Sequence, residues 1–150
     1  MKKTIFLFGI FSNILFFAQE KNNQDAVQNT IYNSPDYKIL QKKMNMKDVV
    51  LFADTKPEFP GGFDVFSRRF FENMPTIDMK QNQKLDTRIY FIVEKNGYVR
   101  NVAATGSDKK HIEAAELGVR RIFIRWKPAT KDGKPVRYLY TFPLSAKKYN

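Results

Sequence analysis

His111 is the only histidine in this chain of 150 residues, so it limits the catalytic and metal chemistry that the sequence can support. The nearest acidic residues are Asp108 and Glu113, and the chain contains no cysteine. One imidazole between two carboxylates is a poor metal site, because protein zinc sites draw on several His and Cys ligands. A Ser-His-Asp triad would need the same histidine, and no glycine-rich loop opens a helix in the phosphate-binding pattern. We therefore predict no enzyme activity, no metal and no cofactor, and a solvated His111 at a helix start.

Two further sets of charged residues could carry chemistry. Asp54, Glu58 and Asp64 have the side chains of an acid–base cluster, but they straddle a Pro-Gly turn and nothing near them indicates an apolar cleft. Basic residues beside aromatic ones are typical of nucleic-acid binding, and the candidates here are Arg68, Arg69, Arg120, Arg121 and Arg125. Because the N-terminus indicates export, we predict no nucleic-acid partner.

The N-terminus has the pattern of a secretory signal. Lys2 and Lys3 form a positive region, the run from Ile5 to Phe17 is largely apolar, and Ala18 offers a small residue for cleavage. We predict a signal peptide over residues 1–18 and a periplasmic or secreted mature protein. A retained inner-membrane anchor is the alternative, although the apolar run is shorter than the roughly 20 residues that span a bilayer. Contact with the membrane is expected only in that alternative.

The charge of the chain is strongly basic. The net charge is +11, and it falls by two, to +9, once Lys2 and Lys3 leave with the signal. In an exported protein such a charge favours anionic envelope surfaces or an acidic protein partner. A diffuse solvated surface charge explains it equally well.

A polar leader precedes the folded domain. Residues 19–56 are dense in Asn, Gln and Lys, which predicts a flexible segment that gains order near Val49–Phe52 as a strand or a lid. Pro57–Gly62 then contains two prolines and two glycines, which cannot continue a helix or a central strand. We therefore place the domain at 57–150.

The domain reads as an α+β unit. Phe63, Phe66 and Phe70 recur at helical spacing, and a second amphipathic helix follows Asp108 and runs to about Arg125. The remaining apolar segments are predicted strands: Arg88–Glu94, then Tyr98–Thr105 after an Asn-Gly turn, and last Val136–Leu144.

The connections predict how these strands are arranged. A helical crossover makes the second and last strands parallel, with the first strand antiparallel between them. The result is a three-stranded antiparallel sheet of split βαβ type with two helices packed on one face. The last strand is then an edge, unless another chain or the leader covers it.

The ordered set of motifs resembles the C-terminal domain of TonB, and most closely the Bacteroidota versions of that family. The resemblance covers residues 57 to 145 and rests on seven elements in order: Pro57–Gly62, the phenylalanine helix, Ile92–Gly97, Ala114–Glu116, Trp126–Ala129, Gly133–Val136 and Tyr140–Pro143. In the family this domain is the periplasmic end of an energy transducer, and it pairs its last strand with the extended TonB box of an outer-membrane receptor.

The resemblance implies a peptide-binding site on the last strand, made by Val136, Arg137, Tyr138, Leu139, Tyr140, Thr141 and Phe142. An unpaired strand edge can accept an extended peptide by backbone hydrogen bonds, with alternate side chains such as those of Tyr138 and Tyr140 setting preference. These residues could instead do no more than complete the sheet.

The chain departs from a full transducer because it lacks a long proline-rich spacer and its apolar N-terminus looks cleavable. The leading hypothesis is an exported peptide-binding module for an envelope protein, such as an outer-membrane receptor. The alternatives are a basic structural module that adheres to envelope surfaces and a short anchored transducer. A homodimer formed by strand exchange is a further option.

Overall fold

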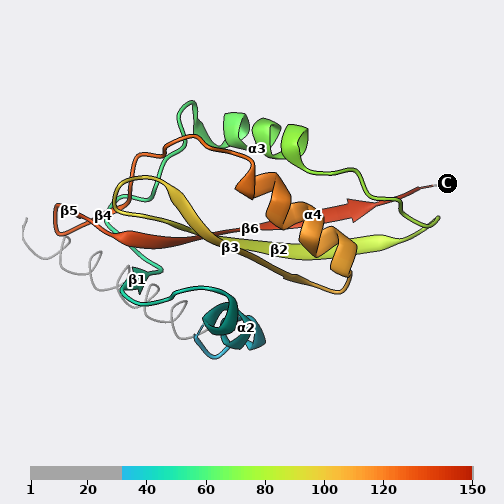
Figure 1. Cartoon of the computed structure of the whole chain (residues 1–150), viewed down its shortest axis with the longest axis horizontal. Helices are drawn as coiled ribbons and strands as arrows, with labels where there is room; N and C mark the ends of the chain where they lie inside the picture. The colour runs from blue at the N-terminus through green and yellow to red at the C-terminus, as the bar shows by residue number, and fades with distance from the viewer. Residues whose placement is uncertain (1–31, 150) are drawn as a thin grey trace, which may run out of the picture. The chain divides into compact units, whose positions relative to one another are not determined.

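The apolar run predicted as the first strand forms the centre of the sheet. In the computed structural model, which describes residues 32–149, β2 (Lys84–Val93) pairs antiparallel with β3 (Val99–Gly106) on one side and with β6 (Arg137–Lys147) on the other. Figure 1 shows these three strands running side by side. The predicted order of second, first and last strand is therefore present in the structure.

The sheet nevertheless has a fourth strand. β1 (Val49–Val50) pairs in parallel with the start of β6, which makes the sheet mixed, in the order β1-β6-β2-β3. A separate two-stranded sheet joins β4 (Thr130–Lys131) to β5 (Lys134–Pro135). The α+β class is right, but a three-stranded antiparallel sheet is not confirmed, because the segment before the predicted domain supplies a strand of its own.

Two helices and a cluster of aromatic rings cover one face of the sheet. α3 (Gly62–Asn73) and α4 (Lys109–Arg120) lie on this face (Figure 1). The ring of Phe66 lies 5.9 Å from that of Phe91 on β2 and 5.1 Å from that of Trp126. Phe70 approaches Phe142 on β6 at 5.4 Å in an edge-to-face arrangement. Aromatic pairs at such distances add roughly 0.5–1.5 kcal/mol each beyond the area they bury.

A third helix covers the opposite face. α2 (Pro35–Lys43) packs near β3, its Leu40 is fully buried, and its Asp36 carboxylate accepts a 2.6 Å hydrogen bond from the hydroxyl of Tyr90. Ile92, which points away from α3 and α4, is also fully buried. This agrees with the unbroken apolar run of β2, which predicts burial on both faces.

The compact unit of the structure begins at Pro35, not at residue 57. Residues 35–56, predicted as part of a flexible leader, supply α2 and β1, and the helices therefore cover both faces of the sheet. The predicted signal peptide and residues 19–31 of the predicted leader lie outside the described residues. Between residues 32 and 149, no helix is both long enough and apolar enough to cross a membrane.

The contact between α3 and α4 requires a glycine. A Cβ atom at Gly118 of α4 would lie 2.7 Å from Cε2 of Phe70 and 3.1 Å from Cβ of Met74. Both atoms belong to the packed α3 segment, so neither can move freely. The small residue at position 118 therefore sets how closely the two helices approach.

We predict that Gly118→Ala lowers the free energy of unfolding by about 1–3 kcal/mol through overpacking. The measurement is urea denaturation, with Glu113→Ala on the exposed side of α4 as the control that changes stability little. Alanine normally stabilises a helix interior relative to glycine by about 1 kcal/mol, so a more stable Gly118→Ala variant would contradict this packing.

Candidate functional site

The backbone groups that could bind a partner lie on the outer edge of β6. The main-chain N–H of Lys148, just after β6, donates to the carbonyl of Gln83 at 3.2 Å. The backbone N–H and carbonyl groups of even-numbered residues in this segment therefore point toward β2. Because hydrogen-bonding direction alternates along an antiparallel pair, the N–H and carbonyl groups of odd-numbered residues of β6 point outward. The outward set includes Thr141, Pro143 and Ser145.

The first part of this edge is covered by the chain itself. Val49 pairs with Arg137 and Val50 pairs with Tyr138. Just before the strand, Val136 donates its N–H to the carbonyl of Ala129 at 3.0 Å. Three of the seven residues predicted to bind peptide, at positions 136, 137 and 138, are therefore occupied within the described chain.

Arg137 fixes this cover in place. Its guanidinium donates to both carboxylate oxygens of Glu94, at 2.8 and 3.0 Å, to the carbonyl of Asn45 at 3.1 Å and to the carbonyl of Lys47. The arginine thus ties the segment before β1 to the end of β2. Such a bidentate ion pair orients the Arg137 guanidinium more firmly than a single hydrogen bond would.

The edge is open from Thr141 onward. No strand among residues 32–149 pairs with the outer side of β6 beyond Tyr138. Thr141 offers both an N–H and a carbonyl there, whereas Pro143 offers only a carbonyl. Of the predicted site, Tyr140 and Phe142 direct their backbone groups toward β2, and Leu139 adjoins the parallel pair at Tyr138, so Thr141 is the residue with an open outward backbone.

The side chains of the two predicted preference-setting tyrosines belong to the core. The ring of Tyr140 stacks 5.1 Å from Phe91 and lies 5.2 Å from Trp126, and Tyr138 is buried. Burial raises the pKa of both tyrosine hydroxyls. What this part of β6 presents to a partner is therefore its backbone.

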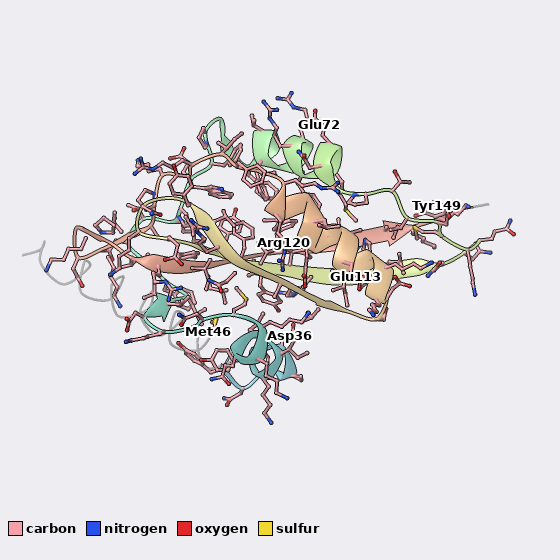
Figure 2. All side chains as sticks on the ribbon, in the orientation of Figure 1. Asp36, Met46, Glu72, Glu113, Arg120 and Tyr149 are labelled. Carbon is pink, nitrogen blue, oxygen red and sulfur yellow. The ribbon has the colours of Figure 1, made fainter. Side chains whose placement is uncertain are left out.

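The opposite edge of the sheet is closed by side chains. The Glu116 carboxylate of α4 accepts the N–H of Ala104 at 3.0 Å, and Arg120 donates to the carbonyl of Val102 at 2.7 Å. The two side chains also pair with each other at 3.0 Å, and Lys43 of α2 reaches Glu116 at 3.3 Å. Figure 2 marks Arg120 on α4 above this edge, and Asp36 on the other side of the sheet. At Val102 and Ala104, β3 cannot accept another strand without breaking these bonds.

Sequence reasoning missed this closure. Glu116 and Arg120 are four residues apart on a helix, a spacing that also produces ordinary surface ion pairs. Two other arginines of the predicted basic stripe likewise bind the main chain: Arg121 donates to the carbonyl of Asn73 at 3.1 Å, and Arg125 donates to that of Asn96 at 2.6 Å.

The three carboxylates considered for acid–base chemistry have separate positions. Asp54 accepts the N–H of Asp132 at 2.7 Å, Glu58 pairs through its backbone with Lys127, and Asp64 lies in the first turn of α3. Within the described part of the chain, no three His, Cys, Asp or Glu side chains are grouped as a metal site would need.

The prediction of a solvated His111 is wrong. The side chain is 1% exposed, and its Nδ1 lies 2.8 Å from the hydroxyl of Thr87 on β2. Its backbone N–H binds the capping carboxylate of Asp108 at 2.8 Å, so the first turn of α4 carries the ring into the core. Burial lowers the pKa of His111, and this outweighs the opposite effect of the carboxylates of Asp108 and Asp86.

His111 should make stability depend on pH. Because its folded-state pKa lies below the unfolded value of about 6.5, the unfolded chain takes up the proton first, and stability falls as the pH drops below that value. We predict a lower urea midpoint at about pH 5.5 than at about pH 7.5, and a smaller difference for His111→Asn, which keeps a polar partner for Thr87. Equal pH dependence in the two proteins would contradict this assignment.

Comparison of the chain with protein-family models, with curated proteins and with solved structures finds no match.

Proposed function

We propose that this chain is an exported peptide-binding module, resembling the TonB C-terminal domain, that pairs the open part of β6 with an extended segment of an envelope or outer-membrane transport protein. One observation supports it above all others. From Thr141 onward the outer backbone of β6 has no strand partner in the described residues, while the β3 edge is occupied at Val102 and Ala104.

Strand addition suits this edge because it depends on backbone groups. A guest strand gains main-chain hydrogen bonds, each with a net value of about 0.5–1.5 kcal/mol. The aromatic side chains of Tyr140 and Phe142 need not move, because they pack against the helical face. They hold the strand rigid, so little ordering is left to be done when a partner binds.

The two edges differ in a way that favours β6 as the place where a guest strand extends the sheet. An unprotected edge is prone to pair with any extended chain, and proteins commonly block such edges with charged side chains or proline. The Glu116–Arg120 pair blocks β3 at Val102 and Ala104, whereas β6 is covered by β1 only at Arg137 and Tyr138. Pro143 limits the open stretch to a short segment, which fits recognition of a short peptide.

The substitution that tests this pairing is Thr141→Pro. Proline removes the outward N–H at position 141 and leaves the ladder to β2 intact, whereas proline at Tyr140 would remove an N–H that is directed toward β2. We expect Thr141→Pro to reduce capture of an envelope partner by roughly tenfold, the value of one or two hydrogen bonds. The measurement is a quantitative pulldown from envelope extract.

Thr141→Val is the matched control because it keeps the backbone N–H. The hydroxyl of Thr141 is buried and has no hydrogen-bond partner in residues 32–149, so its removal should leave the fold as stable or more so. Capture should persist with Thr141→Val and at raised salt. Equal capture by a folded Thr141→Pro variant argues against pairing at this edge, and loss of capture at moderate salt in all three proteins favours surface adhesion through charge.

A further inference from the structure

A groove of about 600 Å³ opens beside β3, at the edge of the sheet that lies away from β6. Its walls come from the start of β3 and from the segment that follows α4. The residues that matter for its chemistry are Lys43, Val99, Arg100, Arg120, Ile122 and Phe123. Its volume falls in the range typical of ligand sites, roughly 300–1,000 Å³.

The groove forms because the segment from Arg120 to Trp126 contacts the β3 side of the sheet at both of its ends and lies away from β3 between them. At one place Trp126 donates its N–H to the carbonyl of Gly97 at 2.8 Å, so closely that a Cβ atom at Gly97 would lie 2.0 Å from the carbonyl oxygen of Trp126. At the other, Arg120 holds the carbonyl of Val102. Residues 121–125 pass between these anchors without pairing with β3.

The groove combines an apolar floor with an exposed aromatic ring. Val119 and Ile122 lie in it and are 1% and 8% exposed, while Phe123 next to them is 88% exposed. A phenyl ring left almost wholly in water loses the roughly 1.5–3 kcal/mol that its burial would provide. A ligand that covers Phe123 would recover part of that free energy.

The charges at the groove are all of one sign. Lys43, Arg100 and Arg120 line it, and none of its described lining residues is acidic. The nearby Glu116 carboxylate is already engaged by Lys43, Arg120 and the N–H of Ala104. The Arg100 backbone pairs with Ile92 of β2, but its guanidinium makes no hydrogen bond or ion pair with any residue between 32 and 149. An acidic ligand would complement this site.

The backbone of β3 is also available in the groove. The carbonyl of Tyr98 accepts a hydrogen bond from the N–H of Glu94 at 2.9 Å, so the backbone groups of Tyr98 point toward β2. Because this direction alternates along the strand, the N–H and carbonyl of Val99 point into the groove. An extended peptide can use such groups, whereas a lipid headgroup cannot match them in register.

We propose that this groove is a second binding site, for an extended acidic peptide segment whose apolar side chains cover Phe123. Acidic side chains of the peptide pair with Arg100, and its backbone meets Val99. The site is separate from the β6 edge and does not depend on the function proposed for it.

The test is titration of a fluorescein-labelled peptide of alternating glutamate and valine, followed by fluorescence anisotropy with the full chain at low salt. We expect saturable binding that weakens roughly tenfold or more in Arg100→Glu and in Phe123→Ser. Arg68→Glu on α3 makes the same charge change away from the groove and should alter affinity less than about twofold. Thr141→Pro should also bind normally.

Three outcomes would overturn the proposal. The first is absence of saturable binding to folded protein. The second is an equal loss in Arg100→Glu and Arg68→Glu, which would mean attraction by diffuse charge. The third is that phosphatidylglycerol vesicles bind through Arg100 and Phe123 while the acidic peptide does not, which would make the site a membrane contact.

Discussion

The structure depends on how the unpaired backbone of an open sheet is satisfied at its two edges. Buried backbone groups need partners, and exposed ones invite pairing with other chains. On β3 the partners are the side chains of Glu116 and Arg120, while on β6 they come from two residues of β1. The same physical requirement is therefore met by different means, and only the β6 solution leaves much of the strand open.

The segment before the predicted domain explains why β6 is partly covered. α2 packs on the face that α3 and α4 leave free, and the chain then passes to β1, where Arg137 holds it through the carbonyls of Asn45 and Lys47. Covering the second face buries Ile92 and Leu139, so this segment contributes to the core as well as to the edge. Binding at β6 and the stability of the domain are consequently linked through residues 35–50.

Long periodic elements could be predicted from the sequence, and contacts between distant residues could not. The unbroken run at Ile89–Val93 and the Asn96-Gly97 turn correctly placed β2 and β3. The two-residue β1 is too short to show a period, although Pro35 followed by Asp36 is a helix-start signal that could have revealed α2. His111 is buried because Thr87, on a separate strand, meets its ring, and no local pattern encodes that contact.

The most direct measurement is amide hydrogen exchange by NMR on the free, monomeric protein. We predict fast exchange at Thr141, whose N–H is directed outward, and slow exchange at Tyr140 and at Ala104, whose N–H groups bind β2 and Glu116. Protection of Thr141 equal to that of Tyr140 would show that the edge of β6 is already sealed, and would contradict an open binding edge.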